Sequence, residues 1–209
     1  MSNNRILIAS FGFDLDFVLR RIARKNYSSV VLLSLKTNDS GERRVDKAFS
    51  TLKSFCLSAG VDCELERLSS KGLIRSVYSI MKEKMKNGKI EVFLTGGPRI
   101  LVVSTIFASL MLNEIESEDV TIAVEGEGFE ENWEANLKSL KALLDLDEKD
   151  REILMLIAVL GRARLSQLAQ SSRIPKTTVF RKLNEMSNNG LVCKSEGYYQ
   201  LCPELDRLI

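Results

Sequence analysis

Short apolar runs rich in β-branched residues alternate with helical patterns through the first two thirds of this 209-residue chain. The runs lie at Arg5–Ser10, Val30–Leu35, Asp62–Arg67, Ile90–Leu94 and Val120–Glu125. Between them, apolar residues recur at the three- and four-residue spacing of amphipathic helices. Strands separated by helices favour a parallel sheet with helices on both faces. The alternation therefore predicts an α/β fold with a doubly wound, mostly parallel sheet.

The helix expected from Pro98 to Asn113 is apolar nearly all round. Its apolar residues cannot all face one sheet, and such a helix needs cover on two sides. We expect one half to pack on the sheet and the other half on a second copy of the chain, which predicts a homodimer. Burial by a neighbouring helix of the same chain is the alternative. Two further helices are expected, one at Leu73–Lys86 and one that begins near Val45 after a polar loop from Lys36 to Arg44.

Composition places the chain among ordinary globular proteins, with 44% hydrophobic and 28% charged residues and a formal net charge of +2. No secretory signal pattern follows Met1. The longest apolar stretch, Ile100 to Leu112, is shorter than the roughly 20 residues that span a bilayer. We therefore expect a cytoplasmic protein with no membrane partner.

The four cysteines Cys56, Cys63, Cys193 and Cys202 form two distant pairs without CxxC spacing, and the chain has no histidine. A zinc site would lack ligands, so we expect no metal and no required cofactor. The cysteines are interpreted as small buried hydrophobic residues. Missing histidine also removes the commonest general base, which favours a protein that is not an enzyme.

A domain boundary is expected near Leu146. Residues 1–130 are predicted to form the α/β domain, residues 131–146 a linker helix marked by Leu137, Leu140 and Leu144, and residues 147–209 a small second domain. The acidic Asp147–Asp150 stretch suits the start of the next helix.

The last 60 residues carry a cationic helical pattern. No acidic residue occurs from Ile153 to Asn184 although six basic residues do. Helices are expected from about Glu148 to Leu160, from Ser166 to Ser171 and from about Lys176, followed by a hairpin whose turn is Ser195-Glu196-Gly197. This order predicts a winged helix-turn-helix domain.

The third of these helices is expected to bury Val179, Leu183 and Met186 and to present its opposite side to DNA. The predicted DNA-binding residues are Arg164, Arg173, Lys176, Thr177, Thr178, Phe180, Arg181 and Lys182. A solvated face of a module that binds only protein is the alternative. The segments Pro175–Leu183 and Asn189–Val192 resemble the winged helix-turn-helix domains of MarR-like prokaryotic regulators.

Two loops are predicted to line a ligand crevice in the α/β domain. Ligands bind beyond the carboxyl ends of parallel strands where the strand order reverses. If the first and fourth strands are neighbours there, the loops Ser10–Asp14 and Thr95–Arg99 meet, and the second can present backbone N–H groups to an anion. Asp14 is expected to cap the first helix. Neither loop is a GxGxxG or Walker A motif, which argues against a dehydrogenase or an NTPase.

The stretch Phe93–Ile100, with Thr-Gly-Gly before a basic residue and an apolar helix, resembles the signature of the CRISPR-associated Rossmann-fold (CARF) domain. Ser10–Phe13 is similar to the first-strand loop of that family. A Rossmann-like domain of this type followed by a winged helix resembles the archaeal CRISPR-associated transcription regulators. Pro98 departs from the small polar residue that the family often has and removes one N–H.

The resemblance implies a homodimer that binds one cyclic oligoadenylate, most simply cyclic tetra-adenylate, across its two-fold axis and controls double-stranded DNA binding near CRISPR-associated genes. The ligand-binding residues it implies are Ser10, Phe11, Gly12, Phe13, Thr37, Asn38, Thr95, Gly96, Gly97, Pro98 and Arg99. The alternatives are a ring nuclease that cleaves the cyclic ligand and a DNA-binding regulator that needs no ligand.

Overall fold

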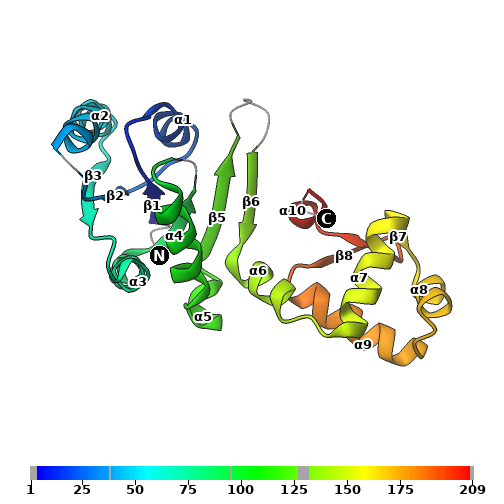
Figure 1. Cartoon of the computed structure of the whole chain (residues 1–209). Coiled ribbons are helices and arrows are strands. Elements are labelled where there is room, and N and C mark those ends of the chain that lie inside the picture. Colours follow the sequence, from blue (N-terminus) through cyan, green and yellow to red (C-terminus); the bar gives the residue numbers. More distant parts are fainter. Residues whose placement is uncertain (1–3, 38, 95, 127–131, 208–209) are drawn as a thin grey trace. The chain divides into compact units, whose positions relative to one another are not determined.

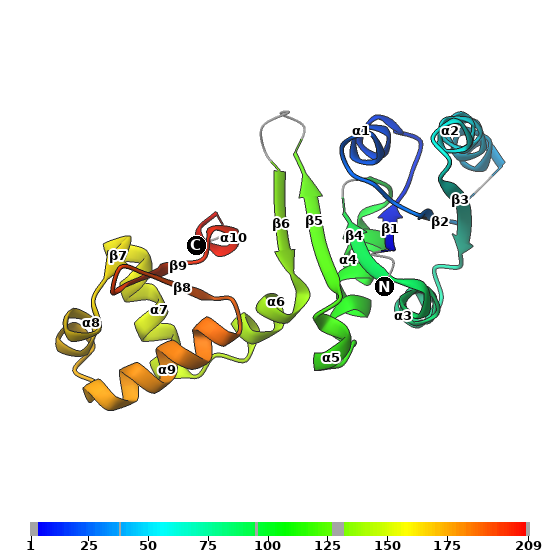
Figure 2. The same ribbon diagram turned by 180° about the vertical axis from the view of Figure 1, so that it is seen from behind.

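The computed structural model describes residues 4–37, 39–94, 96–126 and 132–207 of the chain. It forms two compact units, Met1–Leu137 and Lys138–Ile209. Figures 1 and 2 show the chain from opposite sides. No helix within the described residues is long and apolar enough to cross a membrane.

A six-stranded sheet in the order β3-β2-β1-β4-β5-β6 forms the centre of the first unit. Its strands are β1 (Arg5–Ser10), β2 (Ser29–Leu35), β3 (Asp62–Leu68), β4 (Lys89–Phe93), β5 (Val120–Glu125) and β6 (Asn132–Asn136). Neighbouring strands are parallel except β5 and β6. β1, β2 and β4 are buried almost throughout, as expected when helices cover both faces of a parallel sheet. The predicted α/β fold with a mostly parallel sheet is confirmed.

Helices cover both faces of this sheet (Figures 1 and 2). α1 (Asp16–Arg24) and α2 (Asp39–Ser58) lie on one face, and α3 (Leu73–Lys84) and α4 (Arg99–Leu110) lie on the other. The short helices η1 (Met85–Asn87) and α5 (Glu114–Ser117) precede β4 and β5. The chain winds outward from β1 through β2 and β3, then returns to β4 on the other side of β1. The strand order therefore reverses between β1 and β4, as the crevice hypothesis requires.

The expected linker helix over residues 131–146 is wrong in its first part. Residues Asn132–Asn136 form β6, and only Leu137–Leu144 is helical, as α6. β6 has little intrinsic strand preference, but Glu134 accepts hydrogen bonds from Arg21 Nη2 (2.7 Å) and Lys25 Nζ (2.6 Å) of α1. Burial disfavours the Glu134 carboxylate, yet these two cations hold its pKa below the usual range. Contacts distant in sequence thus hold this strand on the sheet edge.

A buried ion pair lies under α1 at the centre of the same network. Arg21 Nε donates to Glu91 Oε1 of β4 at 2.5 Å, and Tyr27 Oη donates to the same carboxylate oxygen at 2.6 Å. Burial lowers the pKa of Arg21, but the hydrogen bond and charge of Glu91 outweigh it and the net shift is upward. Arg21 therefore stays charged and joins α1, β4 and β6.

The polar stretch expected as a loop from Lys36 to Arg44 is helical from Asp39 onward, which is a second correction. Its acidic and small polar residues suit a first helical turn, where backbone N–H groups point at solvent and favour negative charge. The structure thereby places Gly41 and Arg44 in the first two turns of α2 instead of in the expected polar loop.

The second unit consists of short helices and a small antiparallel sheet in the order β7-β9-β8. After α6, its elements are α7 (Glu148–Leu160), β7 (Arg162–Ala163), α8 (Leu165–Ser172), α9 (Lys176–Asn188), β8 (Val192–Ser195), β9 (Tyr198–Leu201) and α10 (Pro203–Asp206). Ile153, Leu168, Val179, Leu183 and Tyr199 meet in one core. The three expected helices and the expected hairpin are present with bounds within about two residues.

The interpretation of all four cysteines as buried hydrophobic residues is wrong for two of them. Cys193 and Cys202 form a disulfide across the β8–β9 hairpin, with Cα atoms 5.0 Å apart. Cys193 pairs with Gln200 in the hairpin, and Cys202 directly follows β9, so the two cysteines lie diagonally across the two strands. Their nine-residue separation gave no CxxC signal. Cys56 and Cys63 are free and buried as expected, and burial raises the pKa of Cys63 to about 12.

Candidate functional site

The loops after β1 and β4 touch at the point where the strand order reverses. A Cβ atom on Gly12 would lie 3.1 Å from the Gly97 Cα, and one on Gly97 would lie 2.9 Å from the Phe11 carbonyl oxygen. Gly97 also has a φ of +82°, a backbone conformation that residues with a side chain rarely adopt. Gly97 therefore has no room for a side chain, and a side chain at Gly12 would push the two backbones apart. Because Gly12 and Gly97 touch, the backbone of the loop before α4 lies next to the pocket described below.

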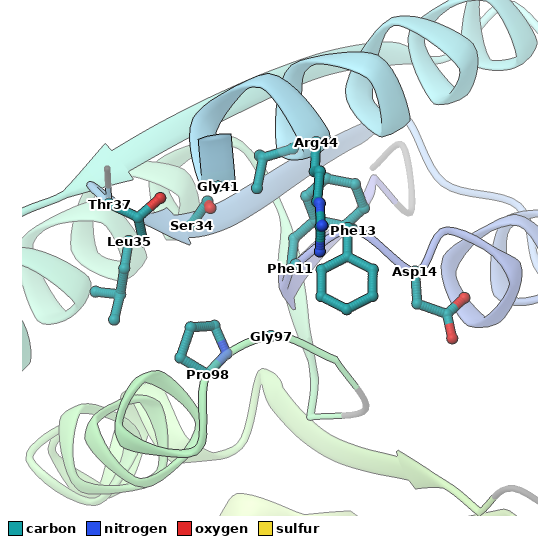
Figure 3. Close-up of a pocket in the computed structure, with 12 residues that line it drawn as sticks. Phe11, Phe13, Asp14, Ser34, Leu35, Thr37, Gly41, Arg44, Gly97 and Pro98 are labelled. Carbon is teal, nitrogen blue, oxygen red and sulfur yellow. The ribbon is translucent and has the colours of Figure 1, made fainter. Parts of the chain in front are cut away.

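A pocket of about 440 Å³ opens beside this contact (Figure 3). We call it the main pocket. It is lined by Phe11, Gly12, Phe13, Asp14, Ser34, Leu35, Thr37, Gly41, Arg44, Val45, Gly97 and Pro98. These residues come from the loop after β1, the end of β2, the first turns of α2 and the loop before α4. Its size is typical of small-ligand sites, which run to roughly 300–1,000 Å³.

α4 begins directly after this loop and is exposed along one apolar side. Leu101, Thr105 and Ala108 are buried against the rest of the unit. On the other side, Ile100, Val103, Ile106, Phe107 and Met111 are between 39% and 61% exposed. We call these five residues the α4 apolar face. Neither the sheet nor the neighbouring helix α3 covers this side of α4. The helix therefore buries one side within its own unit and leaves five large apolar side chains exposed.

In the second unit, a sharp turn joins α8 to α9. Arg173 has a left-handed φ of 56°, and Pro175 stands in extended backbone just before the first residue of α9. Val179, Leu183 and Met186 are buried as predicted. Lys176, Thr177, Phe180 and Arg181 are exposed along the opposite side, and Arg181 Nη1 forms a salt bridge of 2.6 Å with Glu185. We call these four residues the α9 outer face.

Two further arginines lie beside the hairpin. The guanidinium carbons of Arg162 and Arg164 lie 5.0 Å and 4.8 Å from the ring centroid of Tyr198 on β9. Both arginines are exposed, so the aromatic ring orients their charges without removing them from solvent. The cationic character of the second unit therefore extends from α9 to the first residue of β9, next to the turn of the hairpin.

Lys182 is a correction to the expected DNA-binding set, because its side chain does not face outward. It is 4% exposed, and its Nζ lies 2.7 Å from Asp147 Oδ2 and 2.9 Å from Asp150 Oδ1. Lys182 lies at the edge of the buried stripe formed by Val179, Leu183 and Met186, and its ammonium reaches the N-cap and first turn of α7. Lys182 thus ties α9 to α7.

The charges of this ion pair are stabilised in the folded unit. Burial works against the Lys182 ammonium, but hydrogen bonds to Asp147 and Asp150 outweigh it and raise the pKa of Lys182. The hydrogen bond from Lys182 holds the pKa of Asp147 well below its usual range. Asp147 and Asp150 also cap α7 reciprocally, so one lysine completes an acidic cap.

Comparison with known proteins identifies the first unit. A family model described as the Csa3 CRISPR-associated Rossmann-like domain matches residues 5–136, well over half of the chain. The chain belongs to this Csa3 family. The resemblance to CRISPR-associated Rossmann-fold domains that the loops after β1 and β4 carry is thereby confirmed. β6, which the sequence did not predict, lies inside the matched range.

A curated relative aligns with both units of the chain. It is the "CRISPR locus-related putative DNA-binding protein Csa3" of Thermoproteus tenax, 27% identical over 191 residues that make up 87% of this chain and 82% of the relative.

Several solved structures are similar in fold only. Can2 from Sulfobacillus thermosulfidooxidans, solved with cyclic tetra-adenylate, is 14% identical with a TM-score of 0.46, and the match covers 98% of this chain and 63% of that one. Enterococcus italicus Csm6, solved with cyclic hexa-2′-fluoro-hexa-dAMP, is 11% identical with a TM-score of 0.49, covering 90% and 54%. This Csa3 chain spans less than two thirds of each.

The structure gathers six of the expected ligand residues of this Csa3 chain around the main pocket, namely Phe11, Gly12, Phe13, Thr37, Gly97 and Pro98. Ser10, Gly96 and Arg99 are not among its lining residues. Ser10 is buried at the end of β1, and Arg99 is exposed on the first turn of α4. Asn38 and Thr95 lie outside the described residues.

Sequence reasoning missed the contribution of α2 to the pocket. Ser34 and Leu35 end β2, while Gly41, Arg44 and Val45 belong to the first turns of α2. Because residues 36–44 were expected as a loop, Gly41 and Arg44 had no predicted direction. The signal was present, since the buried stripe that begins at Val45 continues backward by one helical turn to Gly41. Asp14 lines the pocket. It was expected to cap the first helix, but Leu15 occupies the N-cap of α1, and Asp14 accepts the Asp16 N–H at 3.1 Å from one residue earlier.

Proposed function

We propose that this Csa3 chain is a dimeric, sequence-specific DNA-binding transcription regulator of CRISPR-associated genes, controlled by a cyclic oligoadenylate bound in the first unit. Cyclic tetra-adenylate is the expected effector. The observation that carries the proposal is the main pocket at the strand-order reversal, built on the contact between Gly12 and Gly97. Open α/β sheets bind ligands at this position.

The chemistry of the pocket supports a nucleotide. Phe11, Phe13, Leu35 and Val45 supply apolar and aromatic surface, while Arg44 and the glycine-rich turn before α4 supply a positive charge and approachable backbone. Bases stack on aromatic rings, and phosphates favour arginine and helix N-termini. A nucleotide, which has both a base and a phosphate, can contact both the aromatic and the cationic residues of this lining.

The α4 apolar face supports a homodimer. It begins at Ile100, two residues after Pro98 of the pocket, so a partner packed on it brings a second copy of the pocket close to the first. A two-fold interface places identical loops around the axis, which suits a cyclic ligand made of identical units. The cost of leaving five large apolar side chains in water favours this association.

The second unit supports DNA binding. α7, α8 and α9 followed by the β8–β9 hairpin have the order and size of a winged helix-turn-helix, with α9 as the recognition helix and the hairpin as the wing. The α9 outer face would enter the major groove. Arg164 and Arg173 are exposed to reach the flanking phosphates. Lys182 is not part of this surface.

Ligand and DNA can be coupled only if the ligand prefers one arrangement of the dimer. The test is the affinity of the full-length protein for duplex DNA from its own CRISPR locus, measured with and without saturating cyclic tetra-adenylate. An affinity change of about 5- to 150-fold is expected for a coupling of ordinary size. An unchanged affinity together with measurable binding of the cyclic ligand would leave a regulator that needs no ligand, and chromatography of the incubated ligand reports any ring cleavage.

A further inference from the structure

The Cys193–Cys202 disulfide closes the open end of the β8–β9 hairpin, the proposed wing of the second unit (Figure 2). Cys193 is the second residue of β8. Cys202 directly follows β9 and donates its N–H to the Leu191 carbonyl oxygen at 3.1 Å. The bond therefore joins the two strands at the end of the hairpin that is remote from its turn.

β8 depends on this bond for its position. In the sheet order β7-β9-β8 it is an edge strand, and its four residues pair with β9 on one side. Lys194 and Ser195, at the end of β8, are exposed. A two-stranded ribbon is marginally stable in water on its own, and a disulfide restricts the open forms of the loop that it closes. The disulfide is therefore a main restraint on this half of the wing.

The wing in turn orients two cations. Arg162 and Arg164 lie over the ring of Tyr198, and Tyr198 is paired with Ser195 of β8 across the turn. Both arginines are exposed beside the proposed DNA-binding surface. A loosened β8 would therefore leave the ring, and the two guanidinium groups above it, less ordered.

The other two cysteines are placed where they cannot respond to a reductant or an oxidant in the same way. Cys56 and Cys63 are free thiols in the core of the first unit, and burial raises the pKa of both. Thiol–disulfide exchange proceeds through the thiolate, so these two thiols are unreactive. Cys193 is only half-buried, on an edge strand, where a reductant from solvent can reach it. The reactive pair thus lies in the wing.

We propose that Cys193 and Cys202 form a thiol–disulfide switch that sets the DNA affinity of the second unit. A dithiol attacks the disulfide as a thiolate, forms a mixed disulfide and then closes on itself. The two cysteines gain two electrons and two protons, and the dithiol becomes a cyclic disulfide. The oxidised wing keeps Tyr198 and its arginines ordered, and the reduced wing does not. This inference rests on the DNA-binding part of the proposed function and adds an input that acts without the cyclic ligand.

The test is the affinity of the full-length protein for duplex DNA from its own CRISPR locus before and after treatment with dithiothreitol, with no cyclic ligand present. Reduction should weaken binding by about 5- to 100-fold, because two arginine side chains must be ordered again on binding. The double variant Cys193→Ala/Cys202→Ala should bind as the reduced wild type does and should not respond to dithiothreitol. Cys63→Ala is the matched control, because it removes a thiol outside the wing and should keep the full response.

Two further measurements accompany the titrations. Alkylation in denaturant followed by mass spectrometry should modify two of the four cysteines before reduction and all four after it. Thermal melts of the reduced protein and of the double variant set a titration temperature at which both are folded, so that weaker binding reports the wing and not unfolding.

The outcomes separate this proposal from the proposed function. Equal duplex affinity of the oxidised and reduced protein overturns the switch and leaves a bond that only stabilises the fold, while the proposed function stands. A response to dithiothreitol that persists in the double variant, or four alkylated cysteines in the untreated protein, also overturns it. If the oxidised protein carries the disulfide and binds no duplex, the DNA-binding function fails and the switch fails with it.

Discussion

α4 and α9 begin in the same way and end up with opposite surfaces. Each follows a proline in extended backbone, Pro98 with ψ 136° and Pro175 with ψ 135°, and each buries one stripe in its own unit. The exposed side of α4 is apolar, whereas that of α9 carries Lys176, Thr177 and Arg181 around one aromatic ring. The proline marks where each helix begins, and the residues on its exposed side indicate which partner it can bind. An apolar side suits another copy of the chain, and a cationic side suits a polyanion.

The largest expected effect is on the apolar side. Phe107→Glu places two carboxylates in the proposed two-fold interface, where unpaired buried charge and like-charge contact cost several kcal/mol, so dimer affinity should fall ~1,000-fold or more. Sedimentation equilibrium measures the change. Ile115→Glu is the control, because Ile115 is 81% exposed on α5, outside the α4 apolar face. A Phe107→Glu protein that sediments as the wild type does would exclude α4 from the dimer.

The second effect concerns the cationic side. Lys176→Ala combined with Arg181→Ala should reduce duplex affinity by roughly 100-fold, because a base contact and a phosphate contact are lost. Thermal stability should not fall, since both side chains are exposed. Lys182→Met is the matched contrast one residue away. It should lower the free energy of unfolding by about 1–3 kcal/mol, because it removes a buried partner of two acids, while folded protein keeps its DNA affinity. The reverse pattern in binding titrations and urea melts would place the recognition surface elsewhere.

The contrast between Arg181 and Lys182 shows what the sequence can and cannot predict. Periodicity predicted five strands and the buried stripe of α9, because these depend on residues close in the chain. The reversal between β1 and β4 entered only as a condition of the crevice hypothesis, and the strand order meets that condition. Periodicity failed for β6, for the partners of Lys182 and for the Cys193–Cys202 disulfide. Each of these failures depends on a partner that the fold supplies: Arg21 and Lys25 for Glu134, Asp147 for Lys182, and the hairpin register for the cysteines. The same holds for the main pocket. Its glycine-containing loops were predicted from the sequence, whereas the residues that α2 contributes were not.

A smaller effect tests how the two helix starts differ. The start of α4 depends on Gly97, whereas Ile174-Pro175 starts α9 without a glycine. Gly97→Ala puts a Cβ 2.9 Å from the Phe11 carbonyl oxygen in a left-handed conformation, and Gly60→Ala meets a similar φ of +69° with open space around it. Gly97→Ala should therefore cost about 1–2 kcal/mol more than Gly60→Ala in urea unfolding and should weaken ligand binding. Equal losses in the two variants would mean that the loop contact can relax.

The smallest effect is the acid dependence of the ion pair that anchors α9. The pKa of Asp147 is lowered in the folded protein, so its contribution to stability is fully present above its ordinary pKa of about 3.8 and is lost as the pH falls below that value. The raised pKa of Lys182 keeps this residue charged below its ordinary pKa of 10.5, so the acid transition comes from its carboxylate partner. Asp147→Asn should therefore be less stable than the wild type by a constant amount between pH 5 and pH 9 in urea melts, and the difference should shrink toward pH 3. The α4 apolar face carries no titratable group, so dimerisation should not follow this acid transition. The asparagine in Asp147→Asn keeps the side-chain oxygen that caps α7, so this substitution tests the charge alone. A difference from the wild type that persists unchanged at pH 3 would show that the Asp147 charge is not what stabilises the folded protein.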